Sequence, residues 1–375
     1  MTVPADTVIR ALRVQNFKCF EDQAFEFGPL TLLSGLNGTG KSSVLQSLAL
    51  LRQSYQRGLL QTEGLVLNGD LVQLGTGKDV FYESATSDEF GFNLEFKDQL
   101  IGSWRFEYDR VADVVRLISE PVSGRVYDRS PFSDNFQYLT AERIGPRNSF
   151  ATSDYLVREL RQLGVRGEYT SHFLDLFGKQ KIASEALAHP KEKTPTLKAQ
   201  VEAWMGEVSP GVRIDLTTYS EIDLVSLQYS FVVGRQVSNR YRSTNVGFGI
   251  TYTLPVVVAL LASSPGTLVL LENPEAHLHP QGQVQMGELM ARAASCGIQV
   301  LVESHSDHVL NGVRIAVRRG LLAPEQTRLY FLDREEESGR IVTQVISPKV
   351  DRNGRIDRWP EGFFDEWDKS LEKLL

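Results

Sequence analysis

The chain has 375 residues, of which 42% are hydrophobic and 23% charged, and its formal net charge is -7. These values predict a folded globular protein with a sizeable core, arranged as one large domain or two modest ones. The negative net charge excludes a uniformly basic surface of the kind that binds nucleic acid. It is compatible with a local basic patch.

The two cysteines, Cys19 and Cys296, have no metal-type spacing and suggest no disulfide framework, which indicates a reducing compartment. The first ten residues lack the apolar run of a signal peptide. The longest apolar stretch, TYTLPVVVALLA, contains Pro255 and is too short to cross a bilayer. We therefore expect a cytoplasmic protein without a membrane partner.

A glycine-rich motif follows the apolar, strand-like run LTLLS. Gly35, Gly40, Lys41 and Ser42 fit the pattern G-x-x-x-x-G-K-[ST], and apolar residues then recur at helical spacing. This order of strand, loop and helix lets backbone N–H groups surround phosphates, with Lys41 at the β- and γ-phosphates and Ser42 at Mg²⁺. A chance glycine-rich turn is the alternative. The predicted phosphate-binding residues are Asn37, Gly38, Thr39, Gly40, Lys41, Ser42 and Ser43.

The middle of the chain predicts two kinds of structure. Residues 75–135 contain short alternating runs such as FGFNLEF and GSWRFEYD, which predict an antiparallel β-subdomain. Residues 150–206 predict a helical insertion with an exposed break at AHPKEKTPT, before strands return at VRIDLTTY and VSLQYSFVV. The absence of heptads predicts that no long coiled coil is present.

Two later strands each end in acidic or polar residues. TLVLL precedes Glu272, and IQVLV precedes Glu303, Ser304 and His305. Strands that alternate with helices in this way predict a parallel α/β sheet, and ligands bind at the carboxyl ends of such strands. An acid at the end of the strand is where a ligand to Mg²⁺ is needed.

These motifs together resemble the ABC-type ATPase heads of the RecF, SMC and Rad50 group, and especially the OLD-family ATPases. The resemblance is carried by VIRALRVQNFKCFED with LTLLSGLNGTGKSS, and by ENPEAHLHP, ESHSDHVL, NVGFGITYTLPVVVALL, YLTAERIGPR and the ending GRIDRWPEGFFDEWDKSLEKLL. It is dense in residues 8–60 and 240–320 and patchy in 75–240. It implies a P-loop NTPase fold and a single ATPase head over residues 1–375, with an aromatic tail at 350–375.

The resemblance also implies ATP and Mg²⁺ as cofactors and a role for each matching position. Lys41 and Ser42 bind phosphate and Mg²⁺, Glu272 is the Walker B acid, and His305 is the switch histidine at the γ-phosphate. Gly247 and Gly249 lie in a degenerate signature segment that meets the nucleotide of another subunit. Gln73, in LVQLGTG, is a weak candidate for a further metal-side residue, because many surface glutamines look like it.

One position departs from the pattern. The family has an aspartate followed by a glutamate that polarises the attacking water, whereas this chain has Glu272 followed by Asn273. Asparagine cannot act as a general base. Either Glu275 or Glu303 therefore supplies the base in a rearranged site, or hydrolysis is slow.

The resemblance favours two heads that sandwich two nucleotides and regulate or power a separate effector, such as a nuclease, in antiviral defence or DNA metabolism. No nuclease motif is evident after the switch segment, so any cutting is expected from another chain. The alternatives are an ATP sensor that does not hydrolyse and a repair ATPase that binds DNA ends. Nucleic-acid contact would use Arg235, Arg240 and Arg242 near Tyr241, which otherwise form a solvated loop.

Three other clusters have less specific interpretations. Four histidines, at 277, 279, 305 and 308, could ligate zinc, but the family pattern already accounts for HLHP. The aromatic residues Trp359, Phe363, Phe364 and Trp367 predict a chain end that docks on its own core, with a partner-binding tail as the alternative. LDREEESGR predicts the solvated tip of a hairpin.

Overall fold

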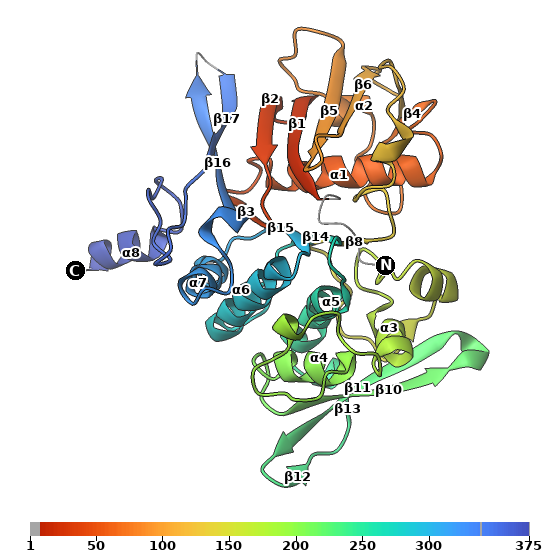
Figure 1. Cartoon of the computed structure of the whole chain (residues 1–375), viewed down its shortest axis with the longest axis vertical. Coiled ribbons are helices and arrows are strands. Elements are labelled where there is room, and N and C mark those ends of the chain that lie inside the picture. The colour runs from red at the N-terminus through yellow and green to blue at the C-terminus, as the bar shows by residue number, and fades with distance from the viewer. Residues whose placement is uncertain (1–7, 338–339, 375) are drawn as a thin grey trace. The chain divides into compact units, whose positions relative to one another are not determined.

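The computed structural model describes residues 8–337 and 340–374, in which the chain forms two compact units (Figure 1). Unit 1 comprises residues 1–136, 324–351 and 355–375, and unit 2 comprises residues 137–323 and 352–354. The glycine-rich motif belongs to unit 1, whereas both later acidic strand ends belong to unit 2.

Unit 1 is rich in strands. An antiparallel sheet has the order β2-β1-β5-β6, and the pair β4 and β7 lies apart from it. Alternating apolar residues give β6 one buried face that includes Trp104 and Phe106. The elements are β1 (Ile9–Phe17), β2 (Phe20–Glu26), β3 (Leu30–Gly35), α1 (Lys41–Gln56), β4 (Gly64–Val66), α2 (Gly77–Val80), β5 (Glu89–Phe96), β6 (Ile101–Glu107), β7 (Val114–Arg116), β16 (Thr327–Glu337), β17 (Arg340–Ile346) and α8 (Glu366–Leu374).

The strand that leads into the glycine-rich motif pairs with a strand from the far end of the sequence. β3 runs parallel to β16, from Leu30 opposite Thr327 to Gly35 opposite Leu332. β16 pairs in turn with β17 in antiparallel register. All but the last residue of β3 are buried, as expected for a parallel strand with both faces covered.

The prediction that all of LDREEESGR forms a hairpin tip was partly wrong. Its first six residues belong to β16, and the pairs Leu332 with Val345 and Glu336 with Ile341 satisfy their backbone groups. The charged side chains do not prevent this, because a strand edge in water tolerates them. The tip itself, residues 338–339, lies outside the described residues.

The aromatic chain end docks partly on unit 1. Phe363 is fully buried, and its ring centroid lies 5.6 Å from that of Phe331. Trp359 contacts Phe363 but remains 47% exposed. The side chain of Trp367 lies outside the described residues.

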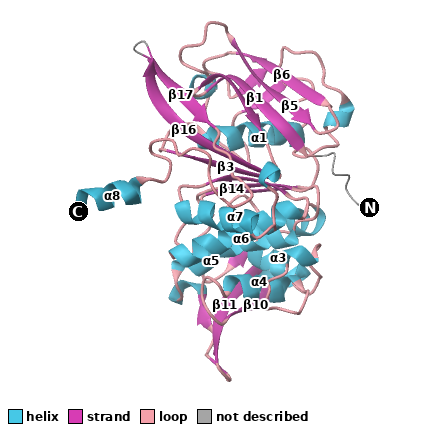
Figure 2. Ribbon diagram, turned by 60° about the vertical axis from the view of Figure 1, so that its left-hand side comes forward, coloured by secondary structure: helices cyan, strands magenta, loops and turns pink. Residues whose placement is uncertain are grey.

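Unit 2 combines helices with two groups of strands (Figure 2). β14 and β15 run parallel, from Leu268 opposite Gln299 to Glu272 opposite Glu303, and β8 follows β14 in the strand order. β10 and β11 form a long antiparallel pair. The elements are β8 (Phe136–Leu139), β9 (Phe150–Ala151), a π-helical turn (Tyr155–Glu159), α3 (Thr170–Phe177), α4 (Leu197–Met205), β10 (Val212–Tyr219), β11 (Leu224–Val233), β12 (Gln236–Val237), β13 (Tyr241–Arg242), α5 (Phe248–Ala262), β14 (Leu268–Glu272), α6 (Pro280–Ser295), β15 (Gln299–Glu303) and α7 (Asp307–Arg318).

Helices α6 and α7 pack closely because glycines face each other at their contact. A Cβ atom added to Gly312 would lie 2.2 Å from the carbonyl oxygen of Val284, and one added to Gly287 would lie 2.3 Å from that of Val309. Larger residues would push the helices apart, together with the loops that precede them. No helix within residues 8–337 and 340–374 has both the length and the apolar character to span a bilayer.

Candidate active site

The glycine-rich motif forms a tight loop between β3 and α1 in unit 1. Gly35 and Gly40 have φ angles of 136° and 103°, which L side chains rarely adopt. A Cβ on Gly40 would also lie 2.3 Å from Sγ of Cys19, and one on Gly35 would lie 2.1 Å from the carbonyl oxygen of Leu332. The path of the loop therefore requires glycine at both positions.

Lys41 lies inside this loop and is almost fully buried. Its Nζ donates hydrogen bonds to the carbonyl oxygens of Gly35, at 3.1 Å, and Leu36, at 2.6 Å. Lys41 is also the first residue of α1, a helix of 16 residues with no acidic side chain in its first turn. The loop thus combines a held ammonium group with the positive end of a helix dipole, which fits a polyphosphate.

The other predicted phosphate-loop residues lie in the same segment. Thr39 is buried, and its Oγ1 donates to the carbonyl oxygen of Leu36, whereas Asn37 is exposed. Ser42 and Ser43 lie in the first turn of α1, so the Ser42 hydroxyl stands next to Lys41. Gln73, in contrast, is exposed between β4 and α2 and makes no hydrogen bond to this loop in the described part of the chain.

The acid at the end of β14 in unit 2 is held by two donors. Oε1 of Glu272 accepts a hydrogen bond from the Tyr138 hydroxyl at 2.6 Å, and Oε2 accepts one from the backbone N–H of Ala141 at 3.0 Å. Burial, followed by the charge of Glu272, raises the pKa of Tyr138 well above its ordinary value. The phenol therefore keeps its proton and acts as the donor.

A buried arginine fixes the backbone around Glu272. Arg143 donates to the carbonyl oxygens of Glu272 and Asn273, each at 2.7 Å, and to that of Tyr252 at 3.0 Å. Burial lowers the pKa of Arg143 to about 10, so the guanidinium is still charged at neutral pH. Sequence reasoning missed the roles of Tyr138 and Arg143, although the segment YLTAERIGPR that contains both was part of the resemblance.

A second acid, which is buried, pairs in register with Glu272. Glu303 ends β15, directly opposite Glu272 in the register, and is only 6% exposed. Its Oε1 lies 4.0 Å from Nε2 of His305. The parallel register thus brings together Glu272, Glu303 and His305, as the strand-end pattern predicted.

Glu275 has a different environment. Its Oε1 accepts a hydrogen bond from the backbone N–H of His305 at 2.8 Å, which ties the turn after β14 to the segment after β15. Its Oε2 is buried without a hydrogen bond among the described residues. Burial raises the pKa of the Glu275 carboxyl, and the hydrogen bonds it accepts only partly oppose this.

Asn273 lies in the turn after β14, between Glu272 and Glu275 in the sequence. Its φ angle is 44°, in the left-handed region that asparagine adopts more readily than most residues. Its backbone N–H donates to the carbonyl oxygen of Glu303 at 2.9 Å, and its Oδ1 is buried without a hydrogen bond in the described part of the chain. The side chain that stands in the family's base position therefore has a buried carbonyl oxygen, and an amide cannot act as a general base.

The predicted signature segment lies at the start of α5. Gly247 precedes the helix, and a Cβ there would meet open space. A Cβ on Gly249 would lie 2.5 Å from the carbonyl oxygen of His277, so Gly249 lets the helix approach the turn after β14. An open pocket of about 460 Å³ adjoins both glycines together with His277 and His279.

The remaining candidates are the histidines that could ligate zinc and the arginines near Tyr241. No group of three or more His, Cys, Asp or Glu side chains within the described ranges is arranged to hold a metal ion. Arg240 forms an ion pair with Asp215 at 3.0 Å. Tyr241 and Arg242 are exposed on β13, and Arg235 is exposed in the turn before β12.

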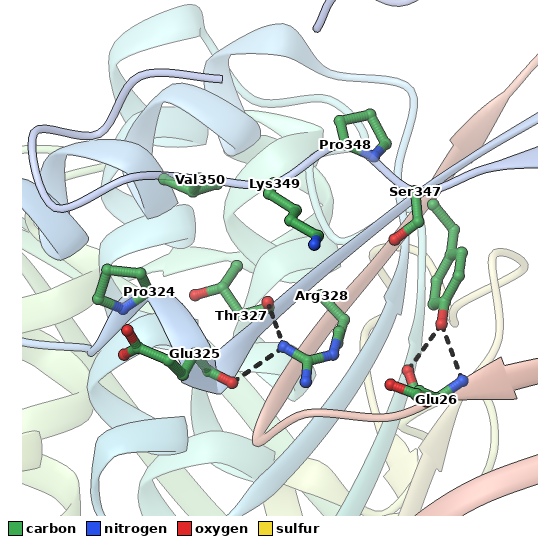
Figure 3. A pocket seen from close by; sticks show the side chains of 10 residues that line it. Glu26, Pro324, Glu325, Thr327, Arg328, Ser347, Pro348, Lys349 and Val350 are labelled. Atoms are coloured by element: carbon green, nitrogen blue, oxygen red, sulfur yellow. Dashed lines mark hydrogen bonds between the residues drawn. The ribbon is translucent and has the colours of Figure 1, made fainter. Parts of the chain in front are cut away.

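A separate pocket of about 390 Å³ in unit 1 lies between the end of β2, the start of β16 and the segment after β17 (Figure 3). The Tyr330 hydroxyl exchanges hydrogen bonds with the backbone of Glu26, and Arg328 donates to the carbonyl oxygens of Glu325 and Thr327. The Ser347 hydroxyl donates to the carbonyl oxygen of Leu329. Many hydrogen-bond donors that line this pocket are therefore already bonded to other residues of the chain. These side chains connect the strands around the pocket.

Under the ATPase activity that the family resemblance implies, replacing Tyr138 with phenylalanine should slow turnover without unfolding the protein. The change removes one charge-assisted hydrogen bond to Glu272, and such bonds contribute about 1.5–3 kcal/mol. We expect a decrease in kcat of about tenfold, with a loss of only a few degrees in Tm. Phosphate release and thermal unfolding measure the two effects, and unchanged kcat would show that Tyr138 does not position Glu272.

Replacing Glu275 with glutamine should stabilise the protein at neutral pH. Because the folded-state pKa of Glu275 is raised, the folded state binds more protons than the unfolded state, and wild-type stability falls as pH rises between the two pKa values. Glutamine has no charge to bury and can still accept the hydrogen bond from His305. We expect a higher Tm for Glu275→Gln at neutral pH, with a difference that shrinks under mildly acidic conditions. A difference that grows on acidification would contradict this.

Comparisons with known proteins identify a family and a fold for this chain. A family model described as "AAA domain, putative AbiEii toxin, Type IV TA system" matches residues 30–311, and one described as "Protein of unknown function (DUF3696)" matches residues 322–374. The "OLD nuclease" of Thermus scotoductus is 41% identical over 44 residues, which are 12% of this chain. The chain matches only 8% of the length of that relative.

Two solved structures share the fold. An SMC head bound to the C-winged helix domain of ScpA has a TM-score of 0.54 at 15% identity, covering 92% of this chain and 98% of the other. An SMC head with an extended coiled coil, bound to the C-terminal domain of ScpA from Pyrococcus furiosus, has a TM-score of 0.51 at 13% identity, covering 98% and 99%. These matches confirm the predicted mixed α/β P-loop fold with its antiparallel β-subdomain.

Proposed function

Because the chain belongs to the AAA-domain family whose description names the AbiEii toxin, we propose that it binds ATP with Mg²⁺ and hydrolyses it. The observation that carries this proposal is the phosphate loop, in which Gly35 and Gly40 have positive φ and the buried ammonium group of Lys41 bonds to the carbonyl oxygens of Gly35 and Leu36. Such a loop binds the phosphate chain through its N–H groups and its lysine.

The ligands that we propose for Mg²⁺ are the Ser42 hydroxyl and the Glu272 carboxylate, which are oxygen donors of the kind that Mg²⁺ prefers. Mg²⁺ supplies charge neutralisation at the β- and γ-phosphates when bound. Tyr138 and Ala141 orient Glu272, and Arg143 fixes the backbone from which it projects.

For the general base we favour Glu303 over Glu275. Glu303 stands next to Glu272 and close to the imidazole of His305, where a γ-phosphate contact is proposed. Glu275 accepts a hydrogen bond from the backbone N–H of His305, which ties the turn after β14 to the segment after β15. Its place therefore suits positioning of the His305 segment more than activation of a water molecule.

The proposal is tested by incubating the purified protein with ATP and either Mg²⁺ or EDTA, followed by chromatographic separation of the nucleotides. We expect ADP and phosphate to form only with Mg²⁺. ATP that is bound but recovered unchanged with Mg²⁺ would favour the alternative of a sensor that does not hydrolyse, which the buried amide of Asn273 motivates.

We further propose that residues 1–375 act as one ATPase head, and that two heads close around two nucleotides. The support is that the phosphate loop and the glycines at the start of α5 occur in one chain. Sedimentation of Glu303→Gln with and without ATP tests this, since blocked hydrolysis should accumulate a dimer. A monomer that hydrolyses ATP at the full rate at every protein concentration would refute the sandwich.

The biological role proposed is regulation of a separate effector in antiviral defence or DNA metabolism, with a nuclease as the first candidate. It is supported by the family description and by the short match to a protein named as a nuclease. Phosphate release should change when the effector is added, and equal rates would count against this role. DNA binding that is salt-dependent and lost on changing Arg240 and Arg242 would instead favour the repair alternative.

A further inference from the structure

We propose that Arg334 is a second phosphate-binding cation of the nucleotide site, supplied by the hairpin of β16 and β17 and not by the glycine-rich motif. The inference rests on the proposed ATP binding and adds a residue from the opposite end of the sequence. It concerns unit 1 alone, to which both Arg334 and the phosphate loop belong.

The strand register places Arg334 beside the loop. β3 ends at Gly35, opposite Leu332 of β16, and β16 continues past this point to Glu337. Arg334 therefore lies two residues beyond the last residue of β16 that pairs with β3, beside the glycine-rich loop that follows β3. Its Nη2 donates a hydrogen bond to the carbonyl oxygen of Gly38. The guanidinium rests against this glycine, since a Cβ on Gly38 would lie 3.0 Å from Nη2 and 3.7 Å from Nη1.

The guanidinium has capacity to bind an anion. Arginine carries five N–H donors in a fixed fork, and only the bond to Gly38 uses this fork among the described residues. Within residues 8–337 and 340–374 no carboxylate forms an ion pair with Arg334, and the adjacent Asp333 accepts from its backbone N–H instead. Arg334 is exposed, so a ligand bound to the loop can reach it.

The thiol of Cys19, which lies near Arg334, does not neutralise the positive charge of the guanidinium. Cys19 contacts the same loop, where its Sγ lies 3.7 Å from the carbonyl oxygen of Thr39. Burial raises the pKa of Cys19, so the thiol is neutral at neutral pH. The loop therefore carries two cations at its carbonyl oxygens: Lys41 at Gly35 and Leu36, and Arg334 at Gly38. Two cations on one loop suit a polyphosphate better than a single phosphate.

The experiment measures Kd for ATP and Mg²⁺ by isothermal titration calorimetry for wild type, Arg334→Gln and Arg334→Lys. Glutamine can keep a hydrogen bond to Gly38 but has no charge, whereas lysine keeps the charge. We expect Arg334→Gln to weaken binding about tenfold or more, and Arg334→Lys to weaken it less. The matched control is Arg105→Ala, an exposed arginine of unit 1 that pairs with Glu89 on the antiparallel sheet; its Kd should not change.

Other outcomes separate the possible failures. Equal Kd for wild type and Arg334→Gln, with binding lost in Lys41→Ala, would overturn the role of Arg334 and leave the proposed function intact. Absence of ATP binding by folded wild type would overturn both. Weaker binding with a large fall in the Tm of nucleotide-free Arg334→Gln, not seen in Arg334→Lys, would show that the side chain only braces the loop and would overturn the proposal.

Discussion

Replacing Lys41 with alanine should weaken ATP binding by about 100-fold or more, which corresponds to about 2.7 kcal/mol. The buried ammonium group is held at the centre of the phosphate loop by the carbonyl oxygens of Gly35 and Leu36. Alanine removes the charge that faces the phosphates and leaves these two carbonyl oxygens without their donor. Calorimetric titration with ATP and Mg²⁺ measures the change.

The control for this prediction is Lys78→Ala, which removes the same charge from the exposed surface of α2 in the same unit. It should bind ATP as wild type does, because surface charges far from a ligand are screened by salt. Equal affinities for wild type and Lys41→Ala would show that nucleotide, if bound, does not use this loop.

Replacing Glu303 with glutamine should abolish hydrolysis while ATP still binds. The carboxylate stands opposite Glu272 and near His305, and glutamine preserves its size but cannot take a proton from water. General bases contribute about 10²- to 10⁴-fold to a rate, so we expect kcat to fall by at least about 100-fold. Phosphate release gives kcat, and calorimetry gives the Kd, which should change by less than about threefold.

The matched comparison for this prediction is Glu275→Gln, which changes the buried carboxylate that accepts a hydrogen bond from the backbone N–H of His305. Because Glu275 is assigned to positioning, its variant should keep a measurable fraction of the activity. If Glu275→Gln were inactive and Glu303→Gln active, the two assignments would be exchanged.

The local geometry of the candidate site follows from short stretches of the sequence. The phosphate loop follows from one contiguous motif, since the glycines, the lysine and the helix start all lie within a few residues. The pairing of Glu272 with Glu303 follows from the rule that parallel strands end at the same edge, because each acid directly follows its own apolar strand.

The parts that depend on distant contacts were not predictable from pattern. Tyr138 reaches Glu272 across 134 residues of sequence, and nothing in the neighbourhood of either residue reveals the contact. Arg334 was hidden for another reason. Its segment is acidic and lacks apolar alternation, so it reads as a hairpin tip, yet pairing with β17 makes it a strand.

Asn273 stands where the family pattern has a glutamate. The sequence identified it as the departure from the family pattern, and the structure adds a physical reason for asparagine. The turn after β14 has a left-handed backbone at this position, and the side-chain oxygen is buried without a hydrogen bond among the described residues. The catalytic function of that position must therefore come from another residue, or hydrolysis must be slow.

The most direct test of ATP hydrolysis by this chain is a single-turnover measurement, with protein in excess over ATP in the presence of Mg²⁺. This design detects one slow conversion that steady-state assays can miss. We predict that wild type converts all bound ATP to ADP and phosphate, that Glu303→Gln binds ATP but leaves it intact, and that Lys41→Ala binds little. ATP that stays bound and intact on folded wild-type protein would contradict the ATPase and leave a nucleotide sensor.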